Sequence, residues 1–233
     1  MEKNLKNKAR LTGVLYLLVI ILAGFSQGYV RGTLFIPEDA QATMKNITSS
    51  EWLFRLGLAT DLIAFMLDAL ISVLLYQLLK SVNKTLAIIT ATFRLLAHPA
   101  IASLNLLNHY MALQVANGNS YLASQGIEQQ ETWTMLFMNA HNAGYLLAGA
   151  FFGIHCLFLG ILLYRSSYFP KALGVLMVLA AAGYLLETFG VFLVPGNEAL
   201  LANVVGFSAA TGEVSFTLYL LIKGIKNSNI PKA

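Results

Sequence analysis

The sequence has 233 residues, of which 57% are hydrophobic and only 11% are charged, and its net charge is +4. Soluble domains carry about 25% charged residues, so this composition excludes an ordinary soluble protein and is typical of a membrane protein with several spans. The basic residues stand at the ends of apolar segments rather than on one face, which excludes a nucleic-acid-binding surface. A single cysteine, Cys156, excludes an intrachain disulfide.

Six segments are long and apolar enough to cross a bilayer, which takes about 20 residues. The first follows a basic N-terminus but lacks a small-residue cleavage site, so we expect it to stay in the mature chain. The third and fourth are longer than a bilayer requires and should tilt or project. We predict an all-α, single-domain bundle over residues 1–233, with spans at 11–30, 53–79, 85–116, 133–164, 171–194 and 199–222.

The loop after the first span, from Arg31 to Glu51, is the longest on its side. It contains PEDAQATMKNI, in which a proline and two acids are typical of a helix start. We therefore predict a short helix there, on the outer surface. The loop 117–132 lies on the same side of the membrane.

Lysine and arginine predict the orientation, because short cytoplasmic loops are enriched in them. On the side of the termini stand eleven basic residues, and on the other side only Arg31 and Lys45. Both termini are therefore predicted to be cytoplasmic. The eleven are Lys3, Lys6, Lys8, Arg10, Lys80, Lys84, Arg165, Lys171, Lys223, Lys226 and Lys232.

The third span carries an unusual polar stripe in the stretch FRLLAHPAIASLNLLNHY. At 100° per residue, Arg94, His98, Asn105 and His109 fall within an arc of about 60°, so they face one direction. Pro99 lies within the stripe and frees a backbone carbonyl, which predicts a kink or a local polar contact. We expect the stripe to face other helices rather than lipid.

Other spans place polar residues on one face in the same way. The second span does so with Asp61, Asp68 and Ser72, and the fourth with a face that holds two histidines. We predict a polar interior site formed by Asp61, Asp68, Arg94, His141, His155 and Glu213, with Arg55, His98, His109 and Glu187 as possible additional members. A separate face of small residues on the fourth span, Gly149, Gly153 and Gly160, predicts close helix packing.

Acids outnumber bases in this interior. Arg94 is the deep base, and Arg55 near the outer boundary is a second, whereas four acids lie within the spans: Asp61, Asp68, Glu187 and Glu213. A bare charge at the bilayer centre costs at least ~2.5–3.5 kcal/mol. Surplus carboxylates must therefore be protonated, face water, pair with a protonated histidine or hold a cation. The structural alternative is that each buried group only pairs with another.

Two pairings follow from estimated depth along the helices. Asp68 and Arg94 have similar depth on consecutive antiparallel spans, so we predict that they interact. Asp61 and His141 also have similar depth, and we predict that they line one outward-facing cavity. Asp68, His155 and Glu213 should lie deeper in the same interior.

The chain resembles the bacterial membrane proteins grouped as domain-of-unknown-function family 4386. The likeness rests on RGTLFIPEDAQAT, NITSSEWLFRLGLATDL, HNAGY, FFGIHC and YFPKALGVL, and it spans nearly the whole length. It implies a six-span protein of the bacterial cytoplasmic membrane, without an established activity. The family pattern includes Arg55, Asp61, Asp68, Arg94, His141, His155 and Glu213, but not histidine at positions 98 and 109.

Four functions remain open. Facing carboxylates and histidines favour a transporter or a proton- or cation-coupled carrier. A metal-dependent enzyme would use His141 and Asp61 as ligands, with Glu187 or His109, although no HExxH spacing is present. A b-type haem could be held by His109 with His141, or by His98 with His155. A sensor or partner subunit needs no chemistry. The expected partners are the lipid bilayer and a small molecule or ion.

Overall fold

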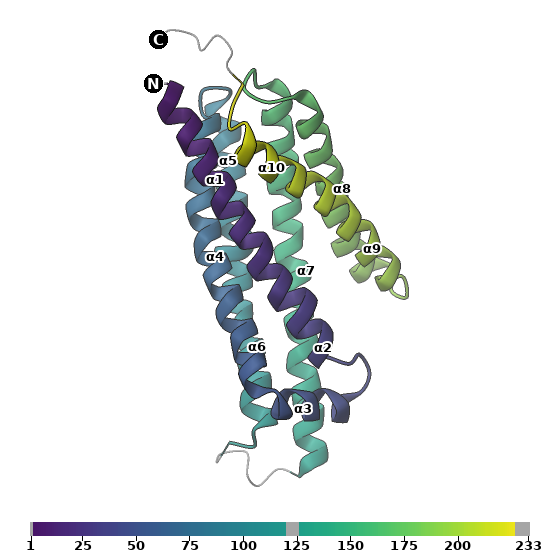
Figure 1. The fold of residues 1–233 in the computed structure, drawn as a ribbon. Coiled ribbons are helices and arrows are strands. Elements are labelled where there is room, and N and C mark those ends of the chain that lie inside the picture. Colours follow the sequence, from purple (N-terminus) through teal and green to yellow (C-terminus); the bar gives the residue numbers. More distant parts are fainter. Residues whose placement is uncertain (1, 120–125, 227–233) are drawn as a thin grey trace.

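The structure, a computed structural model, describes residues 2–119 and 126–226, and of residues 2 and 3 only the backbone. Residues 120–125 of the predicted loop 117–132 lie outside this range. The described residues form a helical bundle without strands (Figure 1). Its helical segments are α1 Glu2–Ala23, η1 Gly24–Arg31, α2 Gly32–Leu34, α3 Ala40–Ser49, α4 Glu51–Leu79, α5 Lys84–Leu95, η2 Leu96–Ala102, α6 Ser103–Ala116, α7 Ile127–Arg165, α8 Lys171–Leu193, α9 Glu198–Ala209, η4 Ala210–Val214 and α10 Ser215–Ile222.

Six of the described helical stretches are long and apolar enough to span a membrane, which confirms the predicted number. They are Asn4–Leu34, Glu51–Leu79, Lys84–Ala116, Ile127–Arg165, Lys171–Leu193 and Glu198–Ile222. The first stretch is longer than predicted, because the helix continues through η1 and α2 to Leu34. Arg31, which we had assigned to the external loop, is therefore part of the first span.

The short helix after the first span is present as α3. It begins where the sequence predicted, because the Asp39 side chain accepts a hydrogen bond from the Ala42 amide and so caps the helix. This helix lies across the end of the bundle opposite the chain ends (Figure 1). At the other end, Gly13 of α1 packs against Leu220 of α10.

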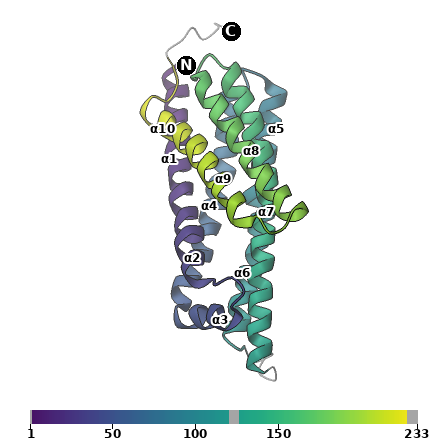
Figure 2. The same ribbon diagram turned by 90° about the vertical axis from the view of Figure 1, so that its right-hand side faces the viewer.

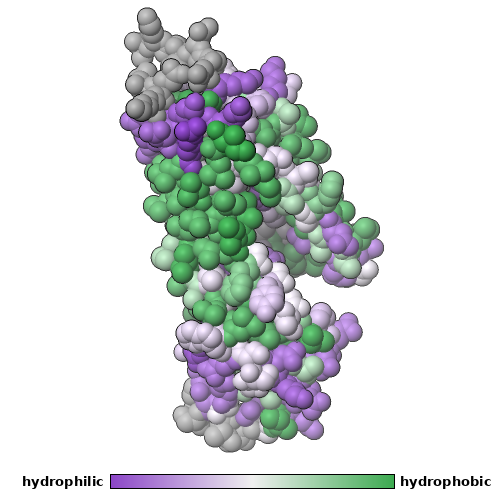
Figure 3. Space-filling view, in the orientation of Figure 1, coloured by the Kyte–Doolittle hydropathy of each residue, from purple (hydrophilic) through white to green (hydrophobic). Residues whose placement is uncertain are grey.

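The helices bury two separate apolar cores. The larger one fills the half nearer the termini and includes Phe152, Leu159 and Phe216. The smaller one lies beneath α3 and includes Met44, Ile47 and Phe54. The surface carries an apolar band between two polar ends (Figure 3), as expected for a chain that crosses a bilayer.

The α8–α9 hairpin is shorter than its neighbours (Figure 1). The Thr188 hydroxyl of α8 donates to the Leu146 carbonyl of α7 over 2.9 Å, and α8 ends at Leu193. The hairpin therefore ends about 8 Å farther along α7, near the level of His141. At 39 residues, or about 58 Å, α7 projects well past this level. The fourth span is thus longer than a bilayer requires, as the sequence predicted, and its tilt or projection in the membrane stays a prediction.

The predicted glycine face of α7 packs closely on α8. A Cβ atom at Gly160 would lie 2.7 Å from the Gly174 carbonyl oxygen, and one at Gly153 would lie 3.1 Å from Tyr184 and Leu185. Only a residue without a side chain lets the two backbones approach this closely.

Candidate functional site

The interior holds two polar layers, one at the boundary between the two apolar cores and one within the larger core. We call the layer nearer the chain termini the proximal layer; it contains Tyr16, Asp68, Arg94, His98, His155 and Glu213. We call the layer nearer α3 the distal layer; it contains Arg31, Asp61, His109 and His141.

The proximal layer is centred on the predicted Asp68–Arg94 pair, which the structure confirms. Arg94 Nη2 forms an ion pair with Asp68 Oδ1, and its Nε donates to the same oxygen over 3.2 Å. Both side chains are fully buried. The guanidinium also lies 4.3 Å from the centre of the Tyr16 ring and 5.1 Å from that of Phe152. These contacts compensate a charge that the bilayer interior would otherwise destabilise.

Two histidines flank this pair. His98 Nδ1 contacts the second carboxylate oxygen of Asp68. His155 Nε2 lies 3.1 Å from Arg94 Nη1, while its Nδ1 lies 2.9 Å from the Thr90 carbonyl oxygen. Because arginine only donates and a carbonyl only accepts, the partners assign His155 as a neutral ring with the proton on Nδ1. His155 therefore extends the network without adding a charge.

Tyr16 links the ion pair to Glu213. Its hydroxyl accepts from Arg94 Nη1 over 2.8 Å and donates to Glu213 Oε2 over 3.3 Å. The other carboxylate oxygen, Oε1, accepts from the Tyr184 hydroxyl over 2.7 Å. A tyrosine hydroxyl can do both because it has one proton and two lone pairs. The network thus runs from α4 through α5 and α1 to η4 and α8.

The distal layer contains a second buried ion pair. Arg31 Nη1 donates to Asp61 Oδ2 over 2.5 Å and to Ser26 Oγ over 2.9 Å. Ser26 in turn donates to the Gly57 carbonyl over 2.8 Å. The close approach of α1 and α4 depends on Gly57, where a Cβ atom would lie 2.9 Å from Val30. The guanidinium carbon of Arg31 lies 5.2 Å from the centre of the Tyr145 ring.

His109 and His141 complete the distal layer. Their ring centres are 5.4 Å apart and nearly perpendicular, and His109 Nε2 lies 3.2 Å from the Phe54 carbonyl oxygen. His141 Nδ1 lies 3.2 Å from the Asn105 carbonyl oxygen, and the Asn105 amide donates to the His141 carbonyl over 2.7 Å. Gly144 makes room for this asparagine, since any Cβ there would collide with it.

Four buried atoms of the distal layer have no hydrogen-bond partner among the described residues. They are Arg31 Nη2, Asp61 Oδ1, His109 Nδ1 and His141 Nε2. An unmatched buried polar group costs about 1–3 kcal/mol. Concentration of such groups in one layer is expected where the protein binds water, an ion or a polar solute rather than where it only packs.

Three π-helical segments interrupt the spans at these layers. The segment η1 ends with Arg31, η2 contains His98 and Pro99, and η4 contains Glu213. The predicted irregularity at Pro99 is confirmed. Such segments leave backbone groups displaced from the regular helical pattern and are frequent at functional sites.

One expectation about the site needs correction. Arg55 does not enter the interior: it pairs with Glu51, four residues earlier, and its side chain is 45% exposed. Asp61 pairs with Arg31, and the outward-facing cavity that it would line with His141 stays a prediction. Asp61 and His141 are linked indirectly, because Tyr145 contacts both His141 and Arg31, which is the partner of Asp61. Glu187 is half-buried on α8.

The donor geometry does not favour a metal or haem site. Across residues 2–119 and 126–226, no three His, Cys, Asp or Glu side chains are grouped to hold a metal ion. His109 and His141 touch edge to face, which leaves no room for a porphyrin between them. Both ring nitrogens of His155 already have protein partners, so it is not available as an axial ligand.

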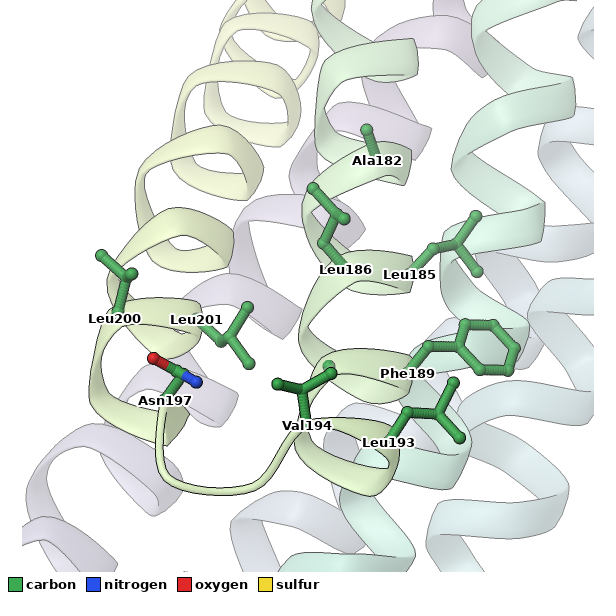
Figure 4. Close-up of a pocket in the computed structure, with 10 residues that line it drawn as sticks. Ala182, Leu185, Leu186, Phe189, Leu193, Val194, Asn197, Leu200 and Leu201 are labelled. Atoms are coloured by element: carbon green, nitrogen blue, oxygen red, sulfur yellow. The ribbon is translucent and has the colours of Figure 1, made fainter.

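A surface groove near the α8–α9 turn is separate from both layers (Figure 4). Its volume is about 680 Å³, and apolar side chains such as Leu186, Phe189 and Leu201 line it together with Asn197. With no ionisable group in its walls, this groove suits hydrocarbon and offers no chemistry.

Comparison with known proteins identifies a family but names no activity. The family model described as a domain of unknown function, DUF4386, matches residues 11–224. The chain belongs to the DUF4386 family. An uncharacterized protein of Archaeoglobus fulgidus is similar, with 29% identity over 164 residues, which cover 70% of this chain and 81% of that protein. No solved structure matches the chain.

Proposed function

We propose that this DUF4386 protein is a membrane carrier that couples the movement of a solute to the binding of a proton or another cation. The observation that supports it most is the difference between the partners of Glu213 and those of Asp68. Asp68 is neutralised by Arg94 and contacted by His98, whereas Glu213 has, within the described part of the chain, only the hydroxyls of Tyr16 and Tyr184 as hydrogen-bond donors. With neutral histidines the proximal layer carries one surplus negative charge, which a proton or a cation can compensate.

Protonation of Glu213 would reach the ion pair through Tyr16. When the carboxylate is ionised, it accepts from both tyrosines. A proton on Oε2 would turn that oxygen into a donor, so the Tyr16 hydroxyl would have to reorient, and with it the bond from Arg94. The titratable and charged groups around Glu213 are Tyr16, Asp68, Arg94, His98, Cys156 and Tyr184.

The interrupted helices also support a carrier. In many transporters, binding sites are formed where spanning helices are broken, because the displaced backbone allows one part of a helix to move relative to the other. Here η1, η2 and η4 bring Arg31, His98 and Glu213 into the interior from three different spans. We further propose that both termini are cytoplasmic, as the basic residues indicate.

Charge movement in proteoliposomes on a solid-supported membrane tests this proposal. The purified full chain is exposed to jumps in pH, Na⁺ or K⁺, with protein-free liposomes as the blank. We expect at least one of the three cations to displace charge in wild-type protein but not in Glu213→Gln. The matched control is Glu128→Gln, which alters an exposed acid at the start of α7.

Two results would overturn the proposal. One is the lack of any displaced charge above that of protein-free liposomes for all three cations. The other is an equal signal from wild-type and Glu213→Gln protein. Size-exclusion chromatography and thermal unfolding of each variant in detergent ensure that only folded protein is compared.

A further inference from the structure

The first and last spans diverge toward the α3 end of the molecule. Near the termini Gly13 of α1 packs against Leu220 of α10, but the chain segment that precedes α10 turns away from α1. Figures 1 and 2 show α9 separating from α1 in two perpendicular views. Figure 3 shows the surface hollowed between the α8–α9 hairpin and the rest of the bundle. We call this hollow the lateral cleft.

Exposed glycines stand on both helices beside the lateral cleft. A Cβ atom at Gly24 or Gly28 of the first span, or at Gly206 of α9, would meet no other atom within 4 Å. The one buried residue of α9 is Val205, which faces α8 at Gly183. Gly206, the next residue along α9, is exposed and has no other atom packed against it.

The closed end of the cleft is acidic. Glu213 lies there, bonded to Tyr16 of α1 and Tyr184 of α8, and it is only half-buried. Glu187 lies one turn from Tyr184 on the same face of α8 and is also half-buried. The two interior arginines are engaged elsewhere, because Arg31 binds Asp61 and Arg94 binds Asp68.

The hairpin beside the cleft exposes large apolar side chains, among them Leu193 and Phe207, which are 74% and 76% exposed. In a bilayer such a surface contacts hydrocarbon rather than water. A ligand that enters sideways must therefore have an apolar body. To be held at the acidic end it must carry a positive charge, because a carboxylate partly shielded from water binds an opposite charge most favourably.

We propose that the lateral cleft binds a lipophilic organic cation, which enters from the bilayer and is held by Glu213. The inference rests on the proposed function, since it names the class of solute that the carrier would move. A proton and the organic cation would compete for the same carboxylate. Binding of the cation to protonated protein would release that proton, so the two would move in opposite directions.

Two ions of the same shape and opposite charge test the charge requirement. Tetraphenylphosphonium is the cationic probe, and tetraphenylborate is its anionic counterpart. Equilibrium dialysis with the full chain in detergent should show saturable binding of tetraphenylphosphonium and none of tetraphenylborate. Equal binding of both ions would overturn the inference, because it would reflect apolar partitioning alone.

Substitutions test where tetraphenylphosphonium binds. Glu213→Gln should lose saturable tetraphenylphosphonium binding. Gly206→Leu, which adds a large side chain to the helix beside the cleft without any neighbour to displace, should weaken binding by about tenfold or more. The matched control is Ala182→Leu, which adds the same side chain to the surface groove of Figure 4 and should bind normally. Unchanged binding by Gly206→Leu would place the ligand elsewhere and overturn the inference.

The two proposals can fail separately. Glu213-dependent charge displacement without any binding of tetraphenylphosphonium would overturn the cation inference and leave the carrier proposal standing. Glu213-dependent tetraphenylphosphonium binding without charge displacement would support the lateral cleft as a binding site and overturn the carrier proposal.

Discussion

Arg31 and Asp61 form a buried ion pair between the first and second spans, with Nη1 and Oδ2 2.5 Å apart. On α4, Asp61 lies between Phe54 of the smaller core and Phe65 of the larger one. The pair therefore joins two helices at the boundary between the two cores. The other terminal atoms of the two side chains, Arg31 Nη2 and Asp61 Oδ1, have no hydrogen-bond partner among the described residues.

Loss of this pair should destabilise the protein much more than loss of an exposed pair. Asp61→Asn leaves the Arg31 charge uncompensated, which typically costs about 3–5 kcal/mol. Glu51→Gln removes the exposed partner of Arg55 and should cost no more than about 1 kcal/mol. Unfolding of both variants in mixed detergent would measure the difference. Equal losses would contradict a structural role for the buried pair.

The Asp68–Arg94 pair should show strong coupling between its members. Asp68→Asn and Arg94→Gln each leave a buried group without its partner and should each reduce the free energy of unfolding by about 3–5 kcal/mol. The double variant should lose clearly less than the sum, because neither charge then remains unpaired. Additive losses would show that the two side chains do not interact.

His141→Met should separate function from stability. The substitution removes a buried nitrogen, Nε2, that has no partner, and replaces it with an apolar side chain of similar volume. We expect the melting temperature to stay equal or rise, while the charge displaced by a cation jump falls. A destabilised variant with a normal signal would show that His141 is only structural.

Two glycines should respond in opposite ways to the same substitution. Gly160→Ala forces α7 and α8 apart, because its Cβ would lie 2.7 Å from the Gly174 carbonyl oxygen, and we expect a loss of about 1–3 kcal/mol. Gly206→Ala meets no atom within 4 Å and removes a flexible residue from a helix, so stability should be unchanged or higher. Thermal unfolding compares the two directly.

Cysteine labelling tests the orientation of the chain in the membrane. The native Cys156 is buried and should not react with the label. A single cysteine replaces one of two exposed residues, either Glu128 near the α3 end or Lys84 near the termini. An impermeant maleimide should label Glu128→Cys in intact cells and Lys84→Cys only after permeabilisation. The reverse pattern would place the termini outside.

The number of spans and the short helix α3 followed from the sequence because both depend on local signals. Apolar length predicts a span wherever it occurs, and Asp39 caps α3 without help from distant residues. The end of the first span was predicted too early, at residue 30. A charge after an apolar run usually marks a loop, but here Asp61 on another helix compensates Arg31 and the helix continues.

The candidate site was predicted in part. Helical periodicity placed Asp68 and Arg94 on facing stripes, and depth then paired them correctly. Tyr16 and Tyr184 were missed, because an aromatic residue in an apolar span looks like packing until its hydroxyl has a partner. Arg55 was misplaced by its nearness to the membrane boundary, although Glu51 stands at the spacing of a helical ion pair.

The length of α7 has a mechanical consequence. It carries His141 of the distal layer and His155 of the proximal layer, about 21 Å apart along one uninterrupted helix. The distance between the two layers is therefore fixed by a single uninterrupted helix, α7. Any motion that exposes one layer while it covers the other must come from the three interrupted helices, whose π-helical segments contain Arg31, His98 and Glu213. They would turn about α7 as a fixed axis.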